Sequence, residues 1–92
     1  MNKTIDRDPV GLFLLVENAD QTIAQLWSEL EENKGDHHRY VRTFDYYSFM
    51  LKERNALFEQ ALLVFRECED ENVLRQAMDI LENRLGIGST VH

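Results

Sequence analysis

The fold is decided by residues 8–35, which read DPVGLFLLVENADQTIAQLWSELEENKG. Asp8 is a suitable N-cap for a helix, and Pro9 fits the first helical position, where a missing N–H costs nothing. Apolar residues then recur at alternating steps of four and three, which keeps them along one side of a helix. This seam consists of Leu12, Val16, Ala19, Ile23, Leu26 and Leu30, widened by Phe13 and Trp27.

Residues that end this helix follow directly. Lys34 suits a last helical turn, and Gly35 suits the position just after a helix. We therefore expect the first helix over residues 9–33. Asp36 is a natural N-cap for a second helix, so the link is short and the two helices should fold back antiparallel as a hairpin.

The second helix is expected over residues 37–68, with an apolar seam of its own. That seam holds Tyr40, Phe44, Tyr47, Leu51, Phe58, Ala61, Phe65 and Cys68. Arg54 stands where the next apolar residue belongs, within the polar run 52–55. Either the helix continues and Arg54 extends to solvent, or the chain bends there. Since no proline or glycine forces a break, we favour a continuous helix.

A third helix is expected over residues 71–85, capped by Asp70 or Asn72 and ended by Gly86. Its predicted apolar face holds Val73, Leu74, Ala77, Met78, Leu81 and Leu85. The residues at both chain ends are expected to be loose. The whole chain is predicted to be a single all-α domain, an antiparallel three-helix bundle with a long central helix.

Composition limits the class of protein. The 92 residues suffice for one small domain, 43% of them are apolar, and the net charge is −7. A surface this acidic repels a phosphate backbone, so nucleic-acid binding is not expected. The longest apolar runs are far shorter than the roughly 20 residues that a bilayer requires, and the sequence shows no secretory signal. We therefore expect a cytoplasmic protein that does not bind membranes.

The three helices differ too much in length to cover all their apolar side chains. The second helix carries another apolar line, Phe49, Ala56 and Leu63, at seven-residue intervals and flanked by Tyr46. The first helix adds Leu14 and Leu15 outside its seam. Burying one large apolar side chain contributes roughly 1.5–3 kcal/mol, so leaving several exposed is costly for a small domain. We expect the contact residues for a protein partner or a second copy to be Tyr46, Phe49, Leu63, Leu14 and Leu15, with a symmetric dimer as the simplest closure.

The segment 37–47, HHRYVRTFDYY, is the one non-acidic part of the chain. Residues 34–54 carry a net charge of +2, and five of the nine aromatic residues lie between positions 40 and 49. Three interpretations stay open: the segment stacks bases or grips phosphates, it anchors a protein interface, or its aromatic residues belong to the core. A bundle that binds a ligand or a metal through this segment is one alternative function.

Sequence motifs for catalysis are lacking. His37 and His38 are neighbours that point about 100° apart on a helix, so they suit no shared metal ion. Cys68 lies on an apolar seam between Glu67 and Glu69, where a thiol behaves as a small hydrophobe. We expect no enzymatic activity, no metal and no cofactor. The acidic flanks allow one more alternative, a mimic of nucleic acid that binds a DNA-binding protein.

Overall fold

The computed structural model describes residues 8–86, and this part of the chain is all-helical with no strand. It contains three helices: α2 (Pro9–Glu32), α3 (His37–Glu67) and α4 (Glu71–Asn83). The expected all-α class is therefore confirmed. No helix in this range combines the length and apolarity needed to cross a bilayer. The terminal segments that were expected to be loose lie outside the described residues.

Each helix begins after an aspartate whose side chain caps it. Asp8 accepts a hydrogen bond from the backbone N–H of Val10, and Asp36 accepts one from that of Arg39. Asp70 accepts from the N–H groups of the second and third residues of α4, so Asp70, and not Asn72, is the cap. A carboxylate at this position satisfies N–H groups that have no partner within the helix. The predicted capping role of these aspartates is confirmed.

The end of α2 differs from the prediction. Its C-cap is Asn33, whose side-chain amide donates to the carbonyl oxygen of Glu29 at 2.9 Å. Gly35 lies in the following turn without a positive φ, so it is not the left-handed cap that was expected. Gly86 does adopt the left-handed conformation, with φ of 73°, just after α4. Asn33 therefore ends α2 with its backbone N–H and its side-chain amide both donating to the carbonyl oxygen of Glu29, without a left-handed glycine.

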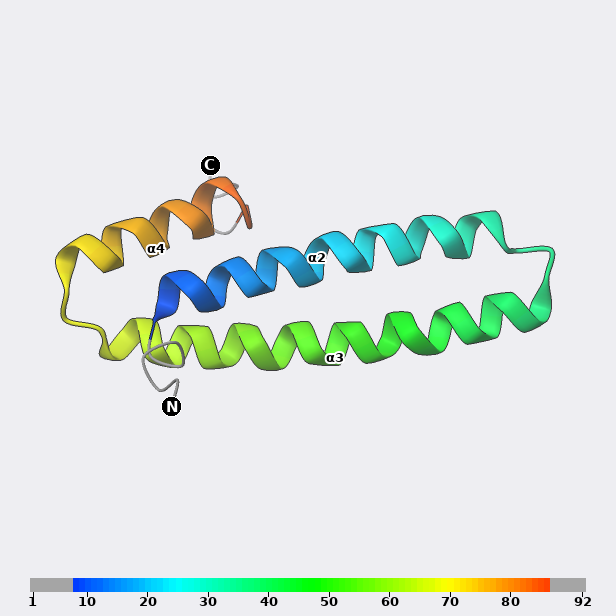
Figure 1. Cartoon of the computed structure of the whole chain (residues 1–92), viewed down its shortest axis with the longest axis horizontal. Coiled ribbons are helices and arrows are strands. Elements are labelled where there is room, and N and C mark those ends of the chain that lie inside the picture. Colours follow the sequence, from blue (N-terminus) through cyan, green and yellow to red (C-terminus); the bar gives the residue numbers. More distant parts are fainter. Residues whose placement is uncertain (1–7, 87–92) are drawn as a thin grey trace.

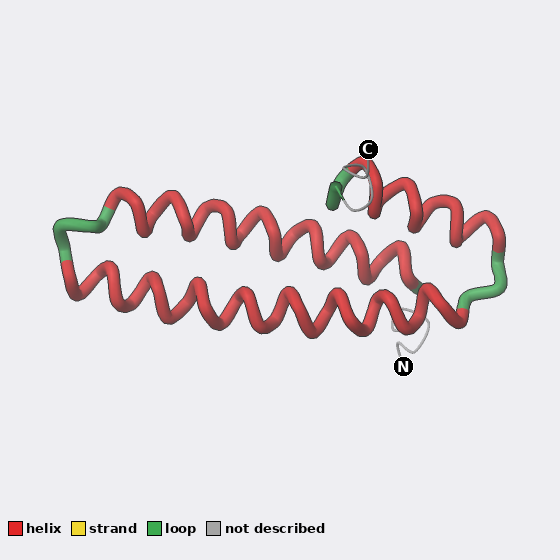
Figure 2. The backbone as a smooth tube through the Cα atoms, turned by 180° about the vertical axis from the view of Figure 1, so that it is seen from behind, coloured by secondary structure: helices red, strands yellow, loops and turns green. Residues whose placement is uncertain are grey.

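The three helices form a flat layer in which α2 lies between α3 and α4 (Figures 1 and 2). The Cα positions span 51 × 40 × 13 Å. α2 and α3 lie side by side over most of their length and are joined by the short loop 33–36. The longest helix is therefore not the central one, contrary to expectation. A layer this thin leaves both of its broad sides open to solvent.

α4 packs on the first half of α2, whereas it was expected to cover the end of α3 (Figure 1). Its buried residues are Ala77 and Ile80, and Ile80 was not part of the predicted face. Arg84 of α4 forms an ion pair with Glu17 of α2 at 3.0 Å. Met78, which was predicted to be buried, is 48% exposed because α4 turns it away from α2. The apolar arc of α4 is thus wider than the surface that α2 covers.

The core lies at the end of the molecule where all three helices meet. Phe13 of α2 is fully buried at its centre, and its ring lies about 6 Å from the rings of Phe58 and Phe65. The other members of the buried cluster are Leu12, Ala61, Ala77 and Ile80. Since α4 spans only 13 residues, about 20 Å, its contact with α2 stops well before the loop 33–36.

α3 is one continuous helix through the polar run 52–55, as favoured from the sequence. Arg54 does not extend to solvent, because its Nε donates a hydrogen bond to Oδ1 of Asp20 on α2 at 2.9 Å. Its guanidinium also lies 5.0 Å from the ring centroid of Phe58. The side chain of Arg54 is only 22% exposed. A charge at an apolar seam position is therefore accommodated by a partner on the facing helix.

Candidate protein interface

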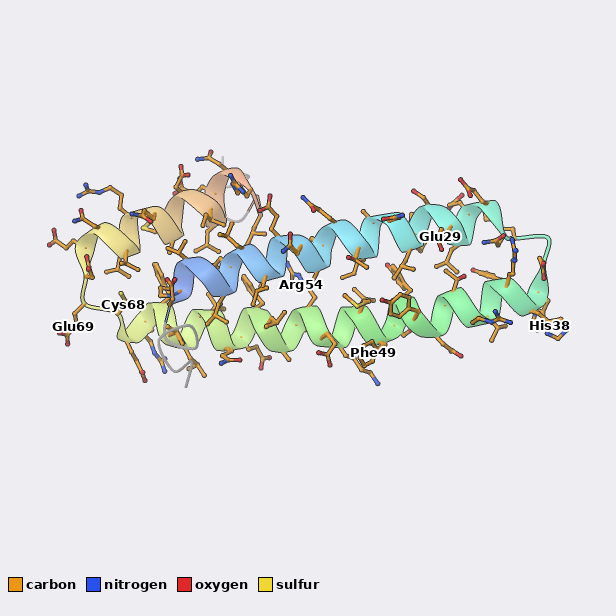
Figure 3. The ribbon with its side chains drawn as sticks, in the orientation of Figure 1. Glu29, His38, Phe49, Arg54, Cys68 and Glu69 are labelled. Carbon is orange, nitrogen blue, oxygen red and sulfur yellow. The ribbon has the colours of Figure 1, made fainter. Side chains whose placement is uncertain are left out.

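The outer face of α3, defined here by Phe49, Ala56 and Leu63, is turned away from α2. Arg54 points toward α2 and Phe49 points away from it (Figure 3). Ala56 follows Arg54 by two residues, a rotation of about 200°, and steps of seven residues keep Phe49 and Leu63 on nearly the same side. Phe49 is 55% exposed and Leu63 is 52% exposed. Sequence periodicity thus predicts the residues that this face presents.

Tyr46 and Leu15 are also exposed, whereas Leu14 is not a free contact residue. Tyr46 flanks the outer face of α3 and is half exposed, and Leu15 on α2 is 43% exposed. Leu14 is half-buried, packs against the core cluster and lines an open groove between α2 and α4. The expectation that Leu14 is uncovered is therefore wrong, because α4 packs on this side of α2. The structure does not gather all five predicted residues on one surface.

A second apolar surface, the aromatic patch, consists of Trp27, Phe44 and Tyr47. The ring of Tyr47 lies 5.7 Å from Trp27 and 6.5 Å from Phe44. Phe44 and Trp27 are each about half exposed. Phe44 lies on the predicted seam of the second helix, where core and protein interface were both left open, and Trp27 was expected to widen the seam of the first helix. Both are exposed because, among residues 8–86, α2 and α3 contact only each other at this end and no third helix lies over their broad side.

The exposed charges beside the outer face of α3 have no ion-pair partner within residues 8–86. Four of them follow the helix at seven-residue intervals and alternate in sign: Asp45, Lys52, Glu59 and Arg66. The ion pairs of the described chain involve other residues, namely Glu31 with Lys34, Asp20 with Arg54 and Glu17 with Arg84. A shallow hollow of about 390 Å³ opens on this side of α3 and is lined by Glu59, Leu62, Leu63 and Arg66.

The residues considered for metal binding or chemistry lie apart from one another. His37 and His38 are exposed beside the loop 33–36, with ring centroids 6.2 Å apart. Cys68 lies at the opposite end of the molecule (Figure 3). It caps the C-terminus of α3 and is partly exposed, with its Sγ 3.9 Å from the carbonyl oxygen of Asp70. Among residues 8–86, no three His, Cys, Asp or Glu side chains are grouped so that they could hold a metal ion.

The sequence left open whether the aromatic residues of segment 37–47 belong to the core or to a protein interface, and it did not predict that Trp27 joins Phe44 and Tyr47 in one exposed patch. Unequal helix lengths indicated that some apolar side chains stay uncovered, but not which ones, because that depends on where each helix packs. What the geometry offers is apolar surface flanked by unpaired charges, which is the composition of a protein contact surface. No family model, curated protein or solved structure matches this chain.

Proposed function

We propose that this chain is a small helical interaction module that acts by binding rather than by chemistry. Its partner is a second copy of the chain or another protein, held through apolar surface on α2 and α3. The observation that carries the proposal is the half exposure of large apolar side chains on a well-formed helical layer, above all Phe49 and Leu63. Large apolar side chains that recur along one exposed helix face are typical of a surface that contacts another protein.

The proposed architecture is an antiparallel helical bundle that is completed by association. Its support is the order of contacts between α2 and α3. Moving seven residues forward on α2, from Asp20 to Trp27, moves the contact seven residues back on α3, from Arg54 to Tyr47. Such a reversal is expected of helices that run in opposite directions and are joined by a short loop.

Burial of the half-exposed apolar side chains favours association. Each large apolar side chain that becomes buried contributes roughly 1.5–3 kcal/mol. These side chains are already about half covered, so each has roughly half of that figure left to gain, and several together make up a sizeable part of the net stability of about 5–15 kcal/mol expected for a domain. Phe, Tyr and Trp are also the residue types that anchor protein interfaces. Within residues 8–86 they contribute half-exposed rings on both α2 and α3.

Light scattering over a range of protein concentrations tests this proposal. The wild-type mass is expected to rise from one chain to two as the concentration increases. The double variant Phe49→Lys/Leu63→Lys is expected to stay monomeric, because it places charge on the outer face of α3. Met78→Lys, an equally polar change at a half-exposed residue of α4, is the matched control and is expected to associate like wild type. If the double variant associates, and captures any partner, just as wild type does, the proposal is wrong.

A further inference from the structure

We propose that two copies of this chain associate through the outer faces of their α3 helices, which run antiparallel with Ala56 of each copy at the twofold axis. This inference rests on the proposed function and names the partner as a second copy. Among residues 8–86, neither of the other helices covers the outer face of α3, because α2 packs on the opposite side of α3 and α4 lies beyond α2 (Figure 1). Phe49, Ala56 and Leu63 are all exposed.

A twofold axis at Ala56 matches the outer face with itself. In an antiparallel pair, a residue seven positions before the axis faces the residue seven positions after it on the other copy. Phe49 therefore packs against Leu63 of the second copy, and the reverse contact forms by symmetry. The methyl side chain of Ala56 allows the two backbones to approach closely at the crossing point. The twofold axis thus places the large side chain of Phe49 against Leu63 and the small side chain of Ala56 at the crossing point.

The shallow hollow on α3 borders the place opposite Leu63 to which the second copy brings its Phe49, on the flank that carries Glu59 and Arg66. Its lining residues are Glu59, Leu62, Leu63 and Arg66. Leu62 and Leu63, which are 40% and 52% exposed, offer an apolar floor for the ring of Phe49. Glu59 and Arg66 border that floor with opposite charges. An aromatic side chain seated between a carboxylate and a guanidinium of the partner is typical of an interface anchor with a polar rim.

The charges that flank this face are complementary in the same register. Side chains on one flank of an antiparallel pair meet side chains on the equivalent flank of the other copy. Lys52 then lies opposite Glu59, and Asp45 lies opposite Arg66, so symmetry gives four pairs of opposite charge. All four side chains are exposed, and none forms an ion pair within the described chain. On the other flank, Glu53 meets the neutral Gln60.

Charge also selects this register over the adjacent ones. Shifting one α3 helix along the other by seven residues in one direction places Lys52 against Lys52 and Asp45 against Glu59. Sliding it by seven residues the other way places Glu59 against Glu59 and Lys52 against Arg66. The first shift keeps Phe49 against Ala56 and the second keeps Ala56 against Leu63, but both lose the contact between Phe49 and Leu63 and bring like charges together, which is unfavourable at an interface. The alternating row therefore specifies one alignment, as charged flanking positions do in coiled coils.

Charge reversal with rescue is the first test, with the dimer dissociation constant measured by sedimentation equilibrium of the full chain. Lys52→Glu turns two attractive contacts into two repulsive ones, and the dissociation constant is expected to rise about tenfold. Glu59→Lys is expected to do the same. The double variant Lys52→Glu/Glu59→Lys restores opposite charges and is expected to dimerise within about twofold of wild type. Arg75→Glu on α4 changes the net charge as Lys52→Glu does and serves as the control.

Disulfide cross-linking tests the position of the twofold axis. With Cys68 replaced by serine, Ala56→Cys places two thiols close together at the axis, where mild oxidation is expected to join the two chains. Ser28→Cys on the exposed side of α2 is the matched control and is expected to remain uncross-linked. Circular dichroism of each variant verifies that the helices are formed, so a folding failure cannot be mistaken for loss of contact.

The outcomes separate this inference from the proposed function. Rescue together with cross-linking at residue 56 supports both. A dimer that ignores every charge reversal and does not cross-link at residue 56 overturns the inference while the proposed function stands, with the aromatic patch as the remaining contact surface. A chain that stays monomeric at every concentration overturns the inference. If it also binds another protein through Phe49 and Leu63, the proposed function still holds.

Discussion

Arg54 of α3 donates a hydrogen bond from its Nε to Oδ1 of Asp20 on α2, at 2.9 Å, inside the line of contact between the two helices. The same guanidinium stacks 5.0 Å from the ring centroid of Phe58. A charged residue thus occupies a seam position without bending the helix. The pair also fixes the alignment of α2 against α3, because a shift by one turn would leave a partly buried charge without its partner.

The coupling between Asp20 and Arg54 is measurable by a double-mutant cycle. Asp20→Ala is expected to lower the free energy of unfolding in urea by about 1 kcal/mol, since it leaves a mostly covered guanidinium unpaired. Asp20→Ala/Arg54→Leu is expected to recover that loss, because leucine restores an apolar seam. The expectation fails if the two single substitutions add without coupling.

Phe13 is expected to be the most sensitive core position. Phe13→Ala removes a fully buried ring that contacts Phe58 and Phe65, which costs about 3–5 kcal/mol. Phe44→Ala removes the same group from a half-exposed site and is expected to cost about 1 kcal/mol or less. Thermal and urea unfolding followed by circular dichroism measure both. Equal losses for the two variants would show that the core does not lie where the three helices meet.

The two loop glycines are expected to respond oppositely to alanine. Gly86 has φ of 73°, a conformation that an L side chain resists, so Gly86→Ala is expected to destabilise the chain by about 1 kcal/mol. Gly35 has no positive φ, and an added Cβ would meet no atom within 4 Å. Gly35→Ala is therefore expected to be neutral or to stabilise by about 0.5 kcal/mol. Urea unfolding midpoints decide between these results.

Trp27, the single tryptophan, reports whether the aromatic patch is used in association. It is 51% exposed and lies against Tyr47, on the side of α3 that faces α2. Association through the outer face of α3 leaves it exposed, so acrylamide should quench its fluorescence equally below and above the dissociation constant. Weaker quenching in the associated state would instead place the aromatic patch at the interface.

The helices could be predicted because the signals that define them are local. An aspartate before each helix accepts hydrogen bonds from that helix's first N–H groups, so Asp8, Asp36 and Asp70 mark three starts. The absence of proline and glycine from residues 36–85 favoured a continuous α3, which the structure confirms. The end of α2 was harder to predict, because Asn33 and Gly35 are both typical of helix ends and the choice depends on the turn that follows.

Only part of the candidate interface was predicted from the sequence, because the exposure of a side chain depends on where the neighbouring helices lie and not only on its residue type. Phe49 and Leu63 lie on the side of α3 opposite Arg54, which periodicity alone indicates. Phe44 has the same periodicity as a buried seam residue yet is half exposed. Its exposure depends on how the helices are arranged in space, and no local pattern encodes that.

The sequence by itself determined that the chain is helical, where each helix starts, and which apolar residues share a helix face, because capping and periodicity act within one turn or two. Only the tertiary structure decided that α4 packs on α2 instead of α3, that α2 is the middle helix, and that Asp20 receives Arg54. Those outcomes depend on how much buried area each alternative packing gains, and that area is shared between segments far apart in the chain.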